Sequence, residues 1–394
     1  MNALKMKRGL LAIACASLPF CLQGQTVQGV TSTEIVLGMH TDLSGVAASF
    51  GVPVANAIRM RIDEVNAAGG INGRKIQLIV EDTGYQVPKA VQAGNKLINS
   101  DKIFAMIGAA GTGMNNAVLP QQLKANIPNL FPISWATTMS EPVNPLQFAI
   151  YQTYSDQIRS GIRYMVEKKG KKAVCAMYQD TDFGRDVLDG INAQLKEMKM
   201  PLVASVNHRA TEQDFSAGIS KLRDAKCDLI AMGTIVRDTI VPYSTARKLG
   251  WADVDFIGTA ASYDLVISGA QGGTTEGYYS TGFFDPPYRD TATPAVAKWF
   301  DAYKARYNSD PAIQAALGHV IIEVTLKAIQ DAGKDLTVKS LTASLERLQG
   351  YRDMFNGPVQ SLSPTNHATA KSSVIYVVHN GRWTRVAESA SLQK

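Results

Sequence analysis

The chain reads Ile35-Val36-Leu37-Gly38-Met39-His40, then Asp42-Leu43-Ser44-Gly45, and later Asn66-Ala67-Ala68-Gly69-Gly70-Ile71-Asn72-Gly73-Arg74 before a second apolar run that ends at Asp82. This order predicts a strand, a polar loop at its carboxyl end, a helix, a turn and a returning strand. The glycine pair suits a helix C-terminus, because glycine adopts the left-handed conformation at little steric cost. Asn72-Gly73 is a tight-turn dipeptide. The segment therefore predicts a βαβ unit, and open α/β sheets bind ligands at the carboxyl ends of such strands.

The rest of the chain alternates between strand-like and helix-like segments. The expected strands are 35–39, 76–81, 104–107, 129–133, 173–178, 202–206, 229–232, 256–258, 373–379 and 382–386. The expected helices are 55–67, 88–99, 116–125, 156–168, 186–198, 215–225, 239–249, 295–307, 313–331 and 338–348. Near-continuous apolar strands with short connections are typical of parallel sheets that helices cover on both faces. Thr293-Pro294 reads as a helix start, and Asn380-Gly381 as a hairpin turn between the last two strands.

The length of the chain indicates more than one lobe. Its 394 residues exceed the roughly 250–300 at which a single hydrophobic core stops growing. Apolar residues make up 45% of the chain and charged residues 19%, which is ordinary for a globular protein. We expect an α/β protein with two doubly wound lobes and parallel-rich sheets, the first lobe ending near residue 152.

The first 24 residues have the pattern of a secretory signal peptide. Three cations precede the uncharged run Gly9–Leu22, which is too short to span a bilayer. Gly24 is a suitable last residue before cleavage. Cys15 and Cys21 fit the lipoprotein sorting pattern poorly, so we do not expect a lipid anchor. The sequence thus predicts an exported, periplasmic protein.

Charge and cysteine content narrow the partners of the mature chain. Removing the leader takes away three positive charges and no negative ones, so it lowers the formal net charge from +6 to +3. No basic stripe remains, and we expect no nucleic-acid partner. Cys175 and Cys227 are available for pairing in an exported protein. Because each lies in or beside an apolar strand-like run, we expect free buried thiols rather than a disulfide.

Two loops after apolar strands carry groups that can hold an anion. The first is Gly108-Ala109-Ala110-Gly111-Thr112-Gly113, whose glycine spacing is one residue out of register for a dinucleotide fingerprint. Small residues there let backbone N–H groups at a helix start approach a carboxylate, and Thr112 adds a hydroxyl. The second is Ser134-Trp135-Ala136-Thr137-Thr138, where Trp135 can cover apolar ligand surface. For both loops, ordinary turn chemistry is the alternative.

A third loop, Asp180-Thr181-Asp182-Phe183-Gly184-Arg185, holds the equivalent place in the second lobe. We expect one of its two aspartates to cap the helix that follows. Phe183 follows a very polar run, which makes it a candidate for a face of a cleft.

From Ile35 to Val386 the chain resembles the Leu/Ile/Val-binding-protein family, the type I periplasmic solute-binding proteins of ABC importers. The resemblance includes Val80-Glu81-Asp82, Asp214-Phe215-Ser216 and Thr275-Glu276-Gly277 as well as the opening segment. It implies a hinge of three chain crossings, which we place near 151–154, 283–287 and 356–361. The implied lobes are 30–153 plus 286–357 for the first and 154–285 plus 358–390 for the second.

The resemblance also assigns ligand-binding positions. In amino-acid-binding members, a hydroxyl residue after the third strand and a small-x-Thr element after the fourth meet the ligand carboxylate. These map onto Thr112 and onto Ala136 with Thr138. The aromatic residues that flank the ligand from the two lobes map onto Phe50 and Phe183.

One departure from the family pattern concerns the ligand ammonium. Leucine-type members place an acid where this chain has Ala260, in the run Gly258-Thr259-Ala260-Ala261-Ser262-Tyr263-Asp264. The second-lobe aromatic near Ile235 is missing as well. An unpaired ammonium in a closed cleft costs several kcal/mol. Either Asp264, Asp238 or Asp180 replaces the acid, or the ligand has no ammonium. We favour an organic acid, aromatic or branched, over an α-amino acid, and include Tyr263 and Asp264 among the expected ligand-binding residues.

Enzyme interpretations have little support. His40, Asp42 and Ser44 lie within five residues on one strand end, whereas the members of a catalytic triad come from separate elements. The five histidines are scattered, and none has metal-ligand spacing. We expect no catalysis, no metal and no cofactor.

The sequence thus predicts a monomeric exported receptor that captures a small carboxylate or amino acid and delivers it to ABC permease subunits, the permease being implied by the resemblance alone. Two alternatives stay open. One is a sensory module of a membrane receptor, and the other is an exported hydrolase acting on a small acid derivative.

Overall fold

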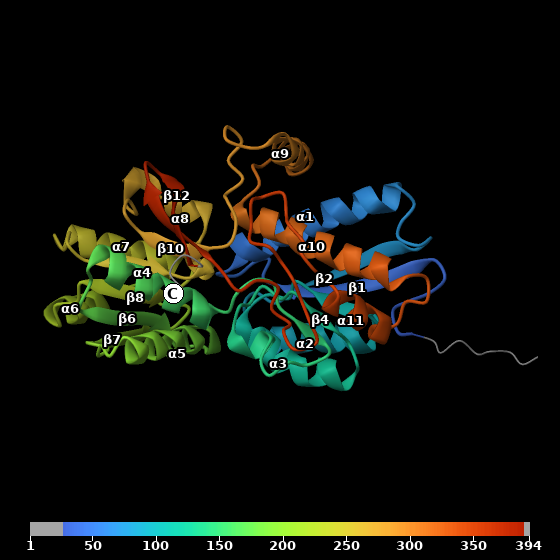
Figure 1. Ribbon diagram of the computed structural model, residues 1–394, viewed down its shortest axis with the longest axis horizontal. Coiled ribbons are helices and arrows are strands. Elements are labelled where there is room, and N and C mark those ends of the chain that lie inside the picture. The colour runs from blue at the N-terminus through green and yellow to red at the C-terminus, as the bar shows by residue number, and fades with distance from the viewer. Residues whose placement is uncertain (1–26, 390–394) are drawn as a thin grey trace, which may run out of the picture.

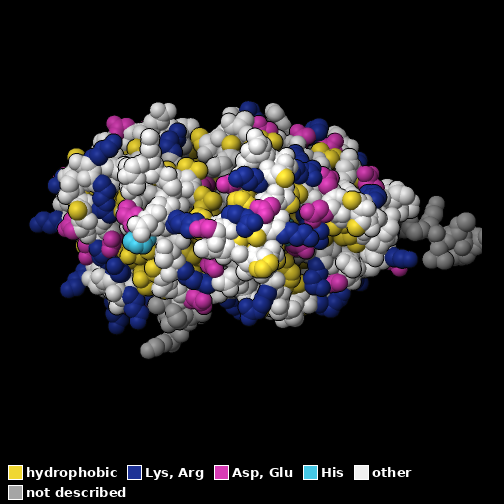
Figure 2. All heavy atoms as spheres, turned by 90° about the horizontal axis from the view of Figure 1, so that it is seen from above, with side chains coloured by type: hydrophobic (Ala, Val, Ile, Leu, Met, Phe, Trp, Pro, Cys, Tyr) yellow, Lys and Arg dark blue, Asp and Glu magenta, His cyan; other side chains and the backbone are white. Residues whose placement is uncertain are grey.

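The computed structural model describes residues 27–389, so the expected signal peptide lies outside the described residues. Two α/β lobes lie side by side, each with a sheet between helices (Figure 1). Between residues 27 and 389, no helix combines the length and apolar character that crossing a membrane requires. On the face drawn in Figure 2, basic and acidic side chains are interspersed rather than gathered into a stripe.

The first lobe contains a parallel five-stranded sheet in the order β2-β1-β3-β4-β5. Its strands are β1 (Glu34–Thr41), β2 (Lys75–Asp82), β3 (Ala105–Ile107), β4 (Asn129–Leu130) and β5 (Gln147–Phe148). Its helices are α1 (Ala48–Ala67), α2 (Val87–Asn99), α3 (Thr112–Lys124), the short η1 (Thr137–Met139), and the later α9 (Pro294–Tyr307), α10 (Ile313–Ala332) and α11 (Val338–Glu346). The later helices join this lobe because α9 and α10 pack against α1, and α11 packs against α10.

The second lobe contains a seven-stranded sheet in the order β12-β11-β10-β9-β8-β6-β7. Its strands are β6 (Val174–Gln179), β7 (Ser205–His208), β8 (Leu229–Gly233), β9 (Asp255–Gly258), β10 (Tyr279–Gly282), β11 (Val374–His379) and β12 (Arg382–Glu388). Its helices are α4 (Tyr154–Lys169), α5 (Asp182–Glu197), α6 (Ser216–Asp224), α7 (Arg237–Lys248), η2 (Ala260–Ser262), α8 (Leu265–Ser268) and η3 (Gln271–Gly273). All pairings are parallel except those that join β10, β11 and β12.

The opening βαβ unit forms as predicted. Strand β1 pairs with β2 in parallel from Glu34 opposite Lys75 to Thr41 opposite Asp82. The reversal before β2 has φ of 51° at Asn72 and 83° at Gly73, the left-handed values that this dipeptide favours. The Asn380-Gly381 hairpin is confirmed in the same way, with both residues at positive φ between antiparallel β11 and β12.

The chain passes between the two lobes three times. It leaves the first lobe after β5, returns to it after β10, and leaves again between α11 and β11. At the centre of these passages the Tyr151 ring stacks on Phe283 with centroids 4.3 Å apart. The Tyr151 hydroxyl donates to Asp353 Oδ2 at 3.3 Å, so side chains from all three passages pack together.

The expectation of free thiols is wrong, because Cys175 and Cys227 form a disulfide with Cα atoms 5.9 Å apart. Cys175 lies in β6, and Cys227 lies just before β8. Since β8 pairs with β6 from Leu229 opposite Val174, the two side chains meet across neighbouring strands. Both residues are buried, as expected, but local hydrophobicity does not reveal which strands are neighbours.

Other differences concern element limits. Strands β5 and β10 were not expected, because one has only two residues and the other, Tyr-Ser-Thr-Gly, lacks an apolar run. Helix α3 begins at Thr112, four residues before the expected start at 116. This earlier start brings the N-terminus of α3 directly after the glycine loop. The helix start at Thr293-Pro294 is confirmed, with the Thr293 hydroxyl accepting from the Val296 amide.

Candidate functional site

A small cavity of about 30 Å³ lies between the carboxyl ends of the first lobe's strands and the facing loops of the second lobe. It is lined by Ala47, Phe50, Tyr85, Ala110, Gly111, Thr112, Ile133, Trp135, Tyr154, Phe183, Ile235 and Ala261. Residues from both lobes close it, so a molecule in this cavity would touch both. We call it the first cavity.

The start of α3 forms the polar end of the first cavity. No side chain of the described residues caps this helix, so its first backbone N–H groups are left to other acceptors. Gly111, at φ of 88°, turns the chain into the helix, and a Cβ there would lie 2.2 Å from Met114 Cε. Thr112 is buried, and its hydroxyl lies 2.8 Å from the Ser134 hydroxyl. Uncapped amides, the helix dipole and a hydroxyl together favour an anion such as a carboxylate.

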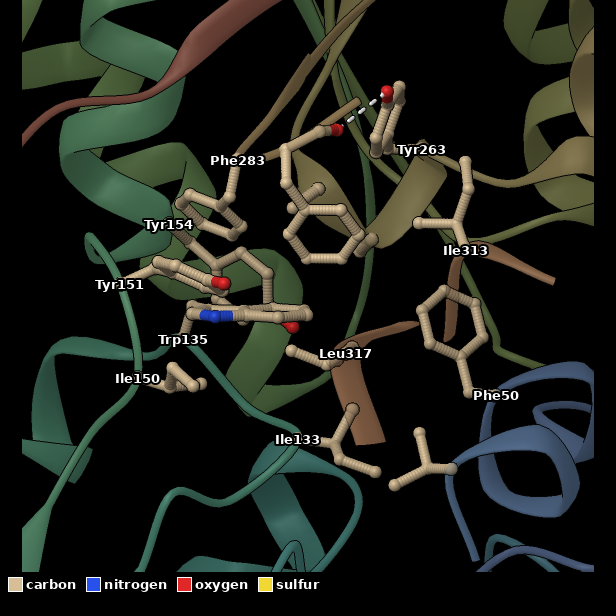
Figure 3. Packing of buried hydrophobic residues seen from close by; sticks show 14 of the residues in the cluster. Phe50, Ile133, Trp135, Ile150, Tyr151, Tyr154, Tyr263, Phe283, Ile313 and Leu317 are labelled. Carbon is tan, nitrogen blue, oxygen red and sulfur yellow. Dashed lines mark hydrogen bonds between the residues drawn. The ribbon is translucent and has the colours of Figure 1, made fainter. Parts of the chain in front are cut away.

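Aromatic rings from both lobes enclose the rest of the first cavity. Trp135 meets Tyr154 edge-on with centroids 5.6 Å apart, and Tyr154 meets Phe183 at 4.8 Å. Figure 3 shows Phe50 and Trp135 on opposite sides of Leu317. These rings provide apolar surface for a ring or a branched chain.

A second cavity of about 20 Å³ lies on the other side of Phe50 and Trp135, which line both cavities. Its lining is Phe50, Trp135, Ala260, Tyr263, Phe283, Phe284, Ile313, Gln314 and Leu317. Ala260 is thus in the second cavity, while its neighbour Ala261 lines the first. The Ala260 amide donates to Gln157 Oε1 at 2.8 Å and is not available to a ligand.

Neither cavity has a charged side chain among its described lining residues. Burial raises the pKa of Tyr85 well above its ordinary value, and nearby Asp238 and Asp42 raise this pKa further. Burial also raises the pKa of Tyr154. Both phenols are therefore neutral at physiological pH and act as uncharged hydrogen-bonding groups.

The three acids considered as replacements at the ammonium position lie outside both linings. Asp180 pairs with Arg185 at 2.9 Å. Asp238 Oδ2 accepts from Gln179 at 2.8 Å and lies 2.9 Å from His208 Nε2. Asp264 Oδ1 accepts from the Val266 amide and so caps α8. Burial raises the pKa of Asp264 to about 6.

The structure brings together some of the residues predicted from the sequence and separates others. Phe50, Thr112, Trp135, Phe183 and Tyr263 each line at least one cavity. Ala136, Thr138 and Asp264 line neither cavity, although they lie in or next to loops that do. Ligand contact by any of the eight stays a prediction.

Thr138 instead belongs to a set of contacts that join the lobes. Its hydroxyl donates to Asn116 Oδ1 at 3.0 Å, and Asn116 Nδ2 donates to Asp182 Oδ2 of the second lobe at 2.9 Å. The Thr137 amide donates to Asp186 Oδ1, also at 2.9 Å. The lobes are therefore hydrogen-bonded to each other through Asn116–Asp182 and Thr137–Asp186.

The expectation of an aspartate cap on α5 is wrong. Thr181 is the capping residue, and its hydroxyl accepts from the Gly184 amide at 3.3 Å. Asp182 lies in the first turn of α5, which leaves its carboxylate free to reach Asn116 of the other lobe.

Sequence reasoning missed Tyr85 and Tyr154 as cavity residues. Tyr85 follows the carboxyl end of β2, a position that by itself predicts a ligand-facing loop. Tyr154 begins α4, inside the first expected crossing.

The structure gives no support to a catalytic group on β1. Both ring nitrogens of His40 are buried without a described partner, and burial lowers the pKa of His40 to about 4. The Asp42 carboxylate accepts from the Ser44, Gly45 and Ala47 amides rather than from the imidazole. Among residues 27–389, no group of three His, Cys, Asp or Glu side chains is placed to hold a metal ion.

Comparison with known proteins gives a consistent result. The family model described as periplasmic binding protein matches residues 34–382. The Leu/Ile/Val-binding protein homolog 7 of Brucella abortus is 22% identical over 335 residues, covering 82% of both chains. A branched chain amino acid ABC transporter protein from Thermus thermophilus with bound valine has a TM-score of 0.83 and 17% identity, covering 91% of this chain and 97% of that one. An ABC transporter solute binding protein from R. palustris in complex with benzoate has a TM-score of 0.78 and 18% identity, covering 90% and 96%.

Proposed function

The chain belongs to the periplasmic binding protein family, and from this premise we propose that it is the substrate-binding subunit of an ABC importer for a small carboxylate that lacks an ammonium group. In this role it binds its solute between the lobes and delivers it to a membrane permease. It carries out no catalysis itself.

The proposed ligand class rests on one observation: the described linings of both cavities contain no charged side chain. An α-amino acid brings an ammonium that needs an acidic partner, and an unpaired buried charge costs several kcal/mol, on the order of 5. Ala260 and Ala261 offer no such partner. Asp180 and Asp238 are engaged elsewhere, and Asp264, which caps α8 through Oδ1, lines neither cavity.

The carboxylate end of the ligand is assigned to the first cavity. There the uncapped N-terminus of α3 and the Thr112 hydroxyl supply donors without a full positive charge. The aromatic rings of Phe50, Trp135 and Phe183 receive the apolar remainder. The relatives with bound valine and bound benzoate show that this fold accepts both kinds of carboxylate, and the uncharged lining favours the second kind here.

Closure of the lobes accompanies binding. The hydrogen bonds from Asn116 to Asp182 and from the Thr137 amide to Asp186 join surfaces that separate when the cleft opens. A ligand that touches both lobes stabilises the joined arrangement and shifts the population towards it. We assign residues 30–153 plus 286–357 to one moving lobe and 154–285 plus 358–390 to the other, in a monomeric periplasmic protein whose leader is residues 1–24.

Isothermal titration calorimetry with matched ligand pairs tests the proposed ligand class. The pairs are 4-methyl-2-oxopentanoate with leucine, and phenylacetate with phenylalanine, with benzoate and valine added. We expect micromolar or tighter binding of at least one acid that lacks an amine, which corresponds to about −8 kcal/mol. Tight binding of leucine or valine, with no binding of the matched acids, would overturn the proposal.

A further inference from the structure

Two side chains in the described lining of the second cavity have incomplete hydrogen bonds: Trp135, whose Nε1 has no described partner, and Gln314, which offers an acceptor rather than a donor. Gln314, the second residue of α10, is 2% exposed. Its Nε2 donates to the Tyr263 carbonyl oxygen at 3.4 Å, whereas its Oε1 has no described partner. The Gln314 side-chain amide directs its NH₂ group, and not its oxygen, toward the Tyr263 carbonyl, because a carbonyl oxygen can only accept a hydrogen bond. Gln314 therefore presents a buried acceptor in the lining of the second cavity.

A buried acceptor without a donor is unfavourable by about 1–3 kcal/mol, so a ligand that supplies a donor there is recognised strongly. Every other residue of the described lining is apolar or aromatic, and the Tyr263 hydroxyl is already engaged with the Phe284 carbonyl oxygen at 3.1 Å. At Gln314, the second cavity thus favours an apolar group that carries a hydrogen-bond donor.

The two cavities are compartments of one cleft. They share Phe50 and Trp135, and volumes of about 30 and 20 Å³ leave room for only one or two water-sized groups each. A ligand larger than this joins the compartments only if Phe50 and Trp135 move apart, and an aromatic ring can then stack against their faces. One end of such a ligand then lies at the N-terminus of α3, and the other lies beside Gln314.

We propose that the preferred ligand is an aromatic carboxylate with a hydroxyl group on the side of the ring opposite the carboxylate, and that Gln314 is the residue that selects this hydroxyl. The inference rests on the proposed function, because it takes the carboxylate end as bound in the first cavity. The hydroxyl donates to Gln314 Oε1. A hydroxyl at the ortho position of the ring, next to the carbon that carries the acidic substituent, stays in the first cavity and does not reach this acceptor.

The test is calorimetry with 4-hydroxyphenylacetate, 2-hydroxyphenylacetate and phenylacetate on three proteins. These are the wild type, Gln314→Leu, and Gln330→Leu as a matched control. Gln330 is an exposed glutamine on the same helix, and it lines neither cavity. We expect the wild type and Gln330→Leu to bind 4-hydroxyphenylacetate about 10-fold more tightly than the other two acids. In Gln314→Leu the three acids bind within about 2-fold of one another, with the affinity for phenylacetate retained.

The outcomes separate this inference from the proposed function. Binding of phenylacetate by the wild type with no preference for the 4-hydroxyl overturns the inference and leaves the proposed function standing. A preference that survives in Gln314→Leu also overturns it. Binding of amino acids alone overturns both. Thermal unfolding of each variant checks its folding, and if Gln314→Leu does not fold, the comparison of the three acids on the wild type still decides.

Discussion

Replacing Thr112 by valine removes the only aliphatic hydroxyl in the described lining of the first cavity. Valine has nearly the same shape, so the packing is kept. A hydrogen bond to a charged group contributes about 1.5–3 kcal/mol, which predicts a roughly 10- to 100-fold higher Kd for a carboxylate ligand. The assay is calorimetric titration with phenylacetate, alongside urea unfolding to measure the free energy of unfolding.

Ser134→Ala is the matched control for this prediction. It breaks the same 2.8 Å contact with the Thr112 hydroxyl, but Ser134 does not line either cavity. Both variants lose about 1 kcal/mol of stability from a buried hydrogen bond. Only Thr112→Val loses the group that faces the ligand. Equal losses of affinity in the two variants, or an unchanged Kd in Thr112→Val, would refute the assignment of Thr112 to the carboxylate.

Three further predictions concern closure, charge burial and the disulfide. Asp186→Ala removes a hydrogen bond between the lobes and raises the calorimetric Kd about 10-fold, whereas Asp189→Ala on the exposed face of the same helix does not. Because burial raises the pKa of Asp264 to about 6, its ionised form destabilises the folded state, and the wild type loses stability as pH rises from about 4 to 6. At pH 7 Asp264→Asn is therefore more stable than the wild type in urea titrations, by about 3 kcal/mol in the free energy of unfolding, and this difference disappears at pH 4. Reduction of Cys175–Cys227, which closes a loop across 52 residues, lowers the free energy of unfolding by about 4 kcal/mol in urea titrations, and an unchanged midpoint contradicts this.

Features governed by local chemistry were predictable from the sequence. The Asn72-Gly73 and Asn380-Gly381 turns follow from the left-handed conformations that these residues tolerate, and apolar runs located most of the strands. The position of Thr112 in the lining of the first cavity was predictable because its loop follows the carboxyl end of a parallel strand, whereas its contact with a ligand stays a prediction.

Features governed by distant neighbours were not predictable. The disulfide depends on β8 lying beside β6, and no local pattern of Cys175 or Cys227 encodes that order. Tyr85 and Tyr154 become lining residues only because the lobes meet. One of the two aspartates, Asp180 or Asp182, was expected to cap α5, yet Thr181 between them does so, since a hydroxyl and a carboxylate can accept from the same amides.

The ligand bound in the uncharged cleft is expected to lack an ammonium group. Native mass spectrometry of the protein purified gently from its own host tests this most directly. The bound molecule is released and identified by tandem mass spectrometry. We predict a carboxylic acid without an amine, bound at one molecule per chain. Recovery of a branched-chain α-amino acid at the same stoichiometry would contradict the account.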